Sequence, residues 1–146
     1  MLSILGAYRR SGAEAGRAIP LAPVDRTSAL DFIAANHRAV LATTRADGGT
    51  QLSPVAAAVD GDTVVVSTRE TAMKTRNLRR RPHASLVVFT DGFFGPWVQV
   101  EGPAEVIALP DAMEGLVAYY RQVAGEHPDW DDYRAAMESA RRRARA

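Results

Sequence analysis

The densest group of side chains that could bind an anion lies between Ser67 and Pro82. This segment contains six basic residues and one acidic residue. If residues 71–80 form a helix, Lys74, Asn77 and Leu78 share one face, and Arg81 continues it, because positions three and four apart lie together. Leu78 can then anchor the helix on the rest of the fold, while Lys74 and Asn77 point along the seam. The segment therefore predicts a basic helix with polar groups beside its core contact.

Lys74 would occupy the first turn of this helix, where the helix dipole disfavours a cation unless an anion lies nearby. Backbone N–H groups at a helix start also attract anions, and Ser67 and Thr68 add hydroxyl donors just before it. Together these groups predict a site for a phosphate or a carboxylate. The alternative, which composition alone favours, is a solvated arginine face on which Lys74 only extends its ammonium group into water.

Other reactive side chains give weaker indications. His37, His83 and His127 are scattered along the chain and lack the spacing of a metal site. The chain has no cysteine, which excludes disulfides and thiolate chemistry. Ser53 lacks the glycines of a nucleophile elbow. We therefore expect no metal and assign no catalytic side chain.

Aromatic and basic residues late in the chain have two interpretations each. Trp97 follows a Gly-Pro breaker and is either a core aromatic or the wall of a ligand cleft. Tyr119 and Tyr120 are predicted to pack a helix against the barrel or a second subunit. The run from Arg141 to Arg145 is typical of a solvated helix end, where cations suit the dipole. Nucleic-acid binding is the less favoured interpretation, because no aromatic residues are interleaved with the run.

Length and composition indicate an ordinary globular protein. The chain has 146 residues and a net charge of +1, which fits one domain and gives no general argument for a nucleic-acid or membrane partner. No apolar run approaches the roughly 20 residues needed to span a bilayer, and the N-terminus lacks the order of a signal peptide. We expect a cytoplasmic protein. Lys74 is the only lysine among many arginines and alanines, a pattern typical of GC-rich genomes that an actinobacterial source would fit.

Turn signals divide the chain into short elements. Residues 1–24 are predicted to be a disordered or extended leader, and residues 25–146 a single domain. A helix is expected from Thr27 or Ser28 to about Asn36. Strands are then predicted at 39–44, 51–59, 63–67, 84–89 and 97–109. Helices are predicted at 71–80, from residue 110 and from residue 130. Pro54 indicates a bulge or an edge strand, and Gly102-Pro103 a bend. The count predicts a mainly β protein with peripheral helices, a small closed or split barrel that the pattern alone does not separate from an OB-like barrel.

The order of short motifs resembles a known family. It runs through Leu41-Ala42-Thr43-Thr44, Asp47-Gly48, Gln51 with Ser53-Pro54-Val55, Ser67-Thr68, Lys74 with Asn77-Leu78, and Pro82. Trp97-Val98-Gln99-Val100-Glu101-Gly102 and Gly125-Glu126-His127-Pro128-Asp129-Trp130 follow. In this order the motifs resemble the pyridoxamine 5'-phosphate oxidase-like split β-barrel proteins, which bind flavin mononucleotide (FMN), and in particular their coenzyme F420-dependent, deazaflavin-using reductases.

The resemblance implies a role for each candidate residue. Lys74 and Asn77 would bind the phosphate and nearby polar groups of the cofactor tail, and Ser67 and Thr68 would contact the ribityl-phosphate region. Gln51, Ser53 and Pro54 would line the isoalloxazine end, with Trp97 as a possible wall. Arg69, Arg76 or Arg81 would meet further negative charge, which favours the deazaflavin because it carries an oligoglutamate tail and FMN does not.

The implied function is hydride transfer between coenzyme F420 and an unsaturated small organic substrate, in a homodimer with the cofactor at the subunit interface. FMN as the cofactor is the alternative within the same fold, and a non-catalytic flavin or deazaflavin carrier is the alternative of another class. The chain departs from the family at its C-terminus, where a helix rich in arginine and alanine stands in place of the usual last strand. Its leader is also longer than usual.

Overall fold

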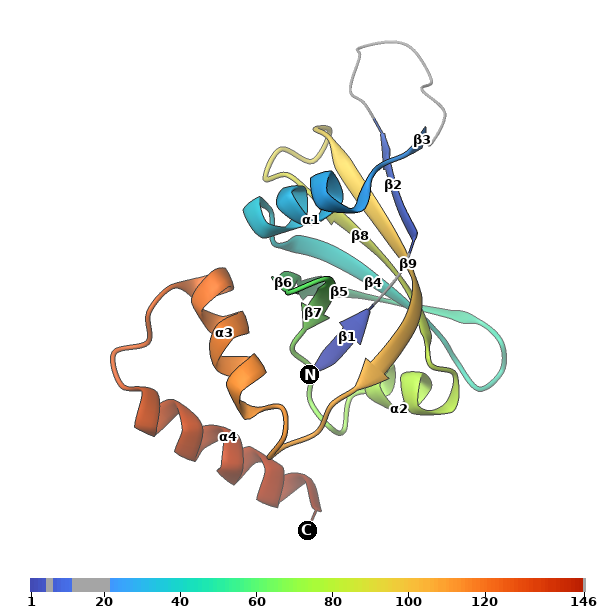
Figure 1. The fold of residues 1–146 in the computed structure, drawn as a ribbon. Helices are drawn as coiled ribbons and strands as arrows, with labels where there is room; N and C mark the ends of the chain where they lie inside the picture. The colour runs from blue at the N-terminus through green and yellow to red at the C-terminus, as the bar shows by residue number, and fades with distance from the viewer. Residues whose placement is uncertain (5–6, 12–21, 146) are drawn as a thin grey trace.

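Short turns join most of the strands of this protein and determine where each strand ends. The computed structural model describes residues 1–4, 7–11 and 22–145 (Figure 1). In chain order the elements are β1 (Leu2–Ile4), β2 (Ala7–Ser11), β3 (Ala22–Pro23), α1 (Arg26–Ala35), β4 (Arg38–Thr44), β5 (Thr50–Ala56), β6 (Ala58–Asp60), β7 (Thr63–Val66), α2 (Met73–Arg80), β8 (His83–Phe89), β9 (Trp97–Val106), α3 (Met113–Ala124) and α4 (Trp130–Arg145).

Two Asp-Gly turns fold consecutive strands back on each other, as the sequence predicts. Between β4 and β5, Gly48 has a φ of 86°, and the backbone N–H of Arg45 donates to the Gly49 carbonyl at 2.8 Å. Between β6 and β7, Gly61 has a φ of 55°. Because glycine adopts a positive φ at little cost, these two residues permit the sharp reversals that place neighbouring strands in register.

The strands close into a barrel through a shared bend. Their order is β5-β4-β8-β9-β1-β7-β6, and all of these neighbours are antiparallel. β5 and β6 lie at the two ends of that order, yet only Ala57 separates them in the chain. The backbone N–H of Ala57 donates to the His37 carbonyl at 2.8 Å, which holds the bend. The predicted mainly β fold with peripheral helices, a split β-barrel, is confirmed.

Strand β9 connects the two parts of the barrel. It is 10 residues long; its first part pairs with β8 and β2, and its last residues, from Ala104 to Val106, pair with β1. The sequence predicts a bend or bulge at Gly102-Pro103. β9 continues without a break through these two residues, which lie between its last pair with β2, at Glu101, and its first pair with β1, at Ala104. Figure 1 shows that β9 as a whole is strongly curved.

The first residues of the chain extend the barrel. β1 lies between β7 and β9 and buries Ile4 completely, while β2 pairs with the first part of β9. Within the segment predicted to be a disordered or extended leader, residues 2–4 and 7–11 are extended strands with hydrogen-bonded neighbours. Residues 12–21, which belong to the same predicted leader, lie outside the described residues.

Alternating side chains fill the barrel, and α1 adds Ala29 and Ile33 to this core. The helix begins earlier than predicted because Asp25 is its N-cap, in place of Thr27 or Ser28. The Asp25 carboxylate accepts from the Ser28 backbone N–H at 2.9 Å and from the Ser28 hydroxyl at 2.6 Å. These hydrogen bonds hold the pKa of Asp25 below its ordinary value.

The last two helices lie outside the barrel. α3 packs beside β6, and α4 turns back beneath α3 (Figure 1). The turn between them is held by an aromatic cluster, in which the ring of Tyr120 lies 5.4, 5.8 and 5.2 Å from those of His127, Trp130 and Tyr133. In the described part of the chain no strand follows α4. No helix within those described ranges is long and apolar enough to cross a membrane.

Candidate functional site

A cavity of about 930 Å³ lies where the loop from β7 to α2 meets the loop from β9 to α3 and the second half of α4. It has the size of a small-molecule site, for which roughly 300–1,000 Å³ is usual. Apolar side chains of the second loop and of α3 form part of its wall. The lining residues are Met1, Ser67, Thr68, Arg69, Glu70, Thr71, Ala72, Lys74, Ile107, Ala108, Leu109, Leu116, Met137, Ala140, Arg141, Arg143 and Ala144.

Four of the predicted site residues meet in this cavity: Ser67, Thr68, Arg69 and Lys74. Lys74 lies in the first turn of α2, as predicted, and is half-buried. The residue that caps this helix, Ala72, offers no side chain to accept from the first backbone amides. Cationic side chains, hydroxyl groups and a helix start with no side-chain cap thus share one wall, a combination that suits an anion.

Thr75 fixes the shape of the loop that carries these groups. Its side chain is 1% exposed; its hydroxyl donates to the Arg69 carbonyl at 2.7 Å and lies 3.2 Å from the Thr68 hydroxyl. The backbone N–H of Ala72 also donates to the Arg69 carbonyl, at 3.1 Å. Sequence reasoning missed Thr75, although a threonine one position after Lys74 in a short helix was the available signal.

A buried polar network joins α2 to strands β4 and β5. Asn77 is 1% exposed, and its side-chain amide N–H group donates to Thr43 Oγ1 and to Gln51 Oε1, each at 3.1 Å. Gln51 Nε2 lies 3.2 Å from Ser53 Oγ, to which it donates. The network therefore runs from the helix to the middle of β5 and links three of the predicted site residues.

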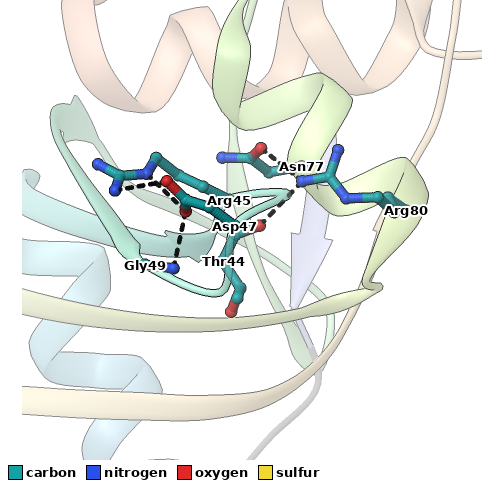
Figure 2. A network of polar contacts seen from close by, with 6 residues as sticks. All are labelled: Thr44, Arg45, Asp47, Gly49, Asn77 and Arg80. Atoms are coloured by element: carbon teal, nitrogen blue, oxygen red, sulfur yellow. Dashed lines mark hydrogen bonds and ion pairs between the residues drawn. The ribbon is translucent and has the colours of Figure 1, made fainter.

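Arg80 completes this network from the outside (Figure 2). Its guanidinium donates to Asn77 Oδ1 at 3.0 Å and to the Thr44 carbonyl at 3.3 Å. Asn77 thus uses both ends of its amide within the protein, has almost no exposed surface and does not line the cavity. Its hydrogen bonds hold α2 against β4 and β5. The same view shows a separate pair of contacts, between Arg45 and Asp47, which hold the β4–β5 turn.

Two other predicted residues lie elsewhere. Pro54 is exposed on β5, which pairs with β4 alone in that part of the sheet, and thus fits the predicted edge position. Trp97 begins β9, opposite Phe89, whereas Ile107 in the cavity wall follows the other end of that strand. At about 3.3 Å per residue, that separation is roughly 30 Å. Within one chain, Trp97 therefore lies far from Lys74.

Tyr119 and His37 make hydrogen bonds that stabilise the fold. The Tyr119 hydroxyl donates to the Ala56 carbonyl at 3.0 Å, which confirms that this residue packs α3 against the barrel. Burial raises the pKa of Tyr119. His37 Nδ1 lies 2.8 Å from the Ala57 carbonyl. In the ranges that the structure describes, no three His, Cys, Asp or Glu side chains gather to hold a metal ion.

The structure changes the interpretation of the C-terminal arginines. The sequence indicates a solvated helix end, but Arg141 and Arg143 line the cavity, while Arg142 between them does not. Arg76 and Arg81, predicted to meet further negative charge, are exposed and do not line it either. Helical periodicity gives the face on which each arginine lies; it does not reveal that α4 folds back over the β7–α2 loop.

Comparisons with known proteins agree with this fold. Residues 27–145 match the family described as pyridoxamine 5'-phosphate oxidase. A conserved hypothetical protein of Mycobacterium tuberculosis, Rv2991, is similar over 82% of this chain and 73% of its own, with 24% identity and a TM-score of 0.62. An F420 reductase is similar over 74% of this chain and 83% of its own, with 21% identity and a TM-score of 0.58.

A heme-binding protein of Mycobacterium smegmatis shares 22% identity over 70% of this chain and 45% of its own, with a TM-score of 0.57. Likenesses at this level of identity show the fold alone. The family match, by contrast, spans most of the chain, from the first turn of α1 to the end of α4, and includes every strand from β4 to β9. On that basis the chain belongs to the pyridoxamine 5'-phosphate oxidase family, whose members bind flavin-type cofactors.

Proposed function

We propose that this protein is a cytoplasmic, homodimeric oxidoreductase that uses the deazaflavin coenzyme F420 to transfer a hydride to or from an unsaturated small organic substrate. The observation that carries the proposal is the cavity at the start of α2, in which Arg69 and Lys74 lie with the hydroxyls of Ser67 and Thr68. These donors fit the phosphate of a flavin-type cofactor, since charged and hydroxyl donors bind phosphate oxygens strongly.

The residues of the chain divide the work of binding. Lys74, Arg69, Ser67 and Thr68 hold the anionic tail in the cavity. Gln51, Ser53 and Pro54 on β5 would line the ring end. None of them lines the cavity, but Gln51 and Ser53 belong to the network that joins β5 to α2. Asn77 and Thr75 are positioning residues, because both are 1% exposed and hold the elements that carry the contacting groups. When bound, the deazaflavin supplies the hydride chemistry, and the protein supplies orientation and exclusion of water.

Trp97 belongs to the site only in a dimer. Within one chain it lies at the far end of β9 from the cavity, so a role as a wall of the cofactor cleft requires the second subunit. A symmetric dimer also agrees with the commonest arrangement of soluble homo-oligomers. No protein group is assigned as general acid, and water can provide the proton that accompanies hydride transfer.

Two alternatives share the same cavity. FMN would use the phosphate contacts without the additional negative charge of an oligoglutamate tail. A non-catalytic carrier would bind either cofactor and turn over no acceptor. The surplus of cations around the cavity favours the deazaflavin, because a single phosphate leaves several of them without an anionic partner.

The test is a titration of the purified protein with the deazaflavin coenzyme and, separately, with FMN, followed by the fluorescence of its two tryptophans, Trp97 and Trp130. We expect micromolar binding of the deazaflavin and weaker binding of FMN. Tighter binding of FMN would show that FMN, and not the deazaflavin, is the cofactor, and the assignment of the fold would stay the same. Binding without hydride transfer to any of a panel of activated alkenes and quinones would favour the carrier, and binding of neither cofactor would refute the proposal.

A further inference from the structure

The second half of α4 forms a wall of the cavity that faces the β7–α2 loop. Met137, Ala140 and Ala144 are spaced as one helical face and line it with apolar atoms. Arg141 and Arg143 line the same cavity from either side of that face. Figure 1 shows the end of α4 returning to the region below β1 and the loop that leads into α2. Two basic groups far apart in the sequence therefore border one space.

The charges around the cavity do not balance. Its lining includes Arg69, Lys74, Arg141 and Arg143 but only one acid, Glu70. Glu70 is itself paired with Arg79, which lies outside the lining. Among the ranges described, neither Arg69 nor Lys74 forms an ion pair. Like charges gathered around a partly enclosed space are unfavourable unless an anion enters it.

The two arginines of α4 keep donors available. Arg141 pairs with Glu138 through one nitrogen at 3.2 Å, and these side chains are 29% and 31% exposed. Arg143 donates one hydrogen bond, at 2.7 Å, to Ser139. A guanidinium carries five N–H donors in a planar fork that matches carboxylates and phosphates, so each arginine can bind an anion while it keeps its contact within the helix.

We propose that Arg141 and Arg143 form a second anion subsite, opposite the one at Lys74, and that a multiply charged anion spans the cavity between them. The cavity, at about 930 Å³, far exceeds a single phosphate, given that one water occupies roughly 30 Å³. The inference rests on the proposed function for the identity of the ligand, which would be the oligoglutamate tail of the deazaflavin. The helix would thereby select cofactors with a polyanionic tail over FMN.

The experiment compares three single variants of the full chain, Arg141→Gln, Arg143→Gln and Arg142→Gln. Each removes one charge from the same turn of α4. Arg142 is the control because it is exposed, as Arg143 is, but does not line the cavity. Binding of tripolyphosphate, inorganic phosphate, FMN and the oligoglutamyl deazaflavin is measured by calorimetry at two salt concentrations. Circular dichroism confirms that each variant retains its helices.

We expect R141Q and R143Q each to weaken binding of tripolyphosphate and of the deazaflavin by about fivefold or more, the scale of a partly exposed charged hydrogen bond. Binding of FMN and of phosphate should change less than about twofold. R142Q should match the wild type for all four probes. Equal losses in all three variants would indicate a general charge effect and overturn the subsite, as would unchanged binding in R141Q and R143Q.

The two proposals fail in distinguishable ways. If the wild type binds neither cofactor, the proposed function fails, while the tripolyphosphate measurements still decide whether the subsite exists. If the wild type binds the deazaflavin and R141Q and R143Q bind it equally well, the subsite is refuted and the proposed function stands. If the wild type binds tripolyphosphate no better than phosphate, the cavity does not hold a polyanion and the subsite is refuted directly.

Discussion

Lys74 and Asn77 lie three positions apart on α2, but their surroundings give them different roles at the residue scale. Lys74 is half-buried in the cavity wall, so Lys74→Ala should weaken cofactor binding by about 1.5–3 kcal/mol, the range of a charged hydrogen bond. The free energy of unfolding should hardly change. Paired titrations and urea unfolding curves check both expectations, with Arg76→Ala, an exposed site on the same helix outside the cavity, as the control. An unchanged dissociation constant for Lys74→Ala would remove that residue from the site.

The main effect of replacing Asn77 should be a lower free energy of unfolding. Asn77→Ala removes the amide that donates to Thr43 Oγ1 and Gln51 Oε1. Gln51 Oε1 then keeps only the Thr43 hydroxyl as a donor, at 3.2 Å, and Arg80 loses an acceptor. A buried group left unsatisfied costs about 1–3 kcal/mol. Urea unfolding should therefore show a lower midpoint with a similar slope. Asn36→Ala is the control, because Asn36 is only half-buried and its side chain makes a single hydrogen bond, to the Phe32 carbonyl at 2.9 Å. If both variants lost the same stability, the network around Asn77 would have no special weight.

At the scale of elements, local signals locate the strands and helices well. The Asp-Gly pairs predict both hairpins because positive φ is a local requirement of the turn. The spacing of Lys74, Asn77 and Leu78 likewise predicts α2 and its shared face. It does not predict that Asn77 is as buried as Leu78, because the partners of Asn77 stand 26 and 34 residues away along the chain. Site residues that contact solvent were thus easier to predict than those that support them.

The attachment of α4 is an element-scale property that can be tested. Tyr120 on α3 contacts His127, Trp130 and Tyr133, and each such aromatic pair is worth about 0.5–1.5 kcal/mol. Tyr120→Ala should let α4 open more often, so trypsin should cleave among its arginines about tenfold faster when opening precedes cleavage. Mass spectrometry of the fragments locates the cuts. Tyr119→Phe, which keeps its ring and loses only the bond to Ala56, should leave this rate unchanged. Equal rates in Tyr120→Ala and the wild type would show that other contacts hold the helix.

At the scale of the whole molecule, closure of the barrel depends on contacts that no local pattern reveals. Leu2–Ile4 is too short to be recognised as a strand, and its composition matches that of a loose terminus. Its place is set by neighbours far along the chain: Leu2 pairs with Val66 on one side and with Val106 on the other. Most of the order of strands and helices from α1 onward could therefore be predicted from the sequence, but the segment expected as one strand over 51–59 is two strands, β5 and β6, divided at Ala57. The strand that joins β7 to β9 could not be predicted.

Because β1 is part of the barrel, its fully buried Ile4 side chain should contribute more to stability than the three-residue length of the strand suggests. Ile4 is 0% exposed and belongs to the main core cluster, so Ile4→Ala should cost about 2–5 kcal/mol of unfolding free energy, the range for such truncations in a core. Chemical denaturation checks the loss, and Leu52→Ala, at a side chain 67% exposed, is the control with the same kind of truncation. Because β1 also borders the cavity through Met1, Ile4→Ala should loosen the cofactor site as well, which a parallel titration detects. A loss no larger than that of Leu52→Ala would mean that the barrel is stable without this strand and that the site does not depend on it.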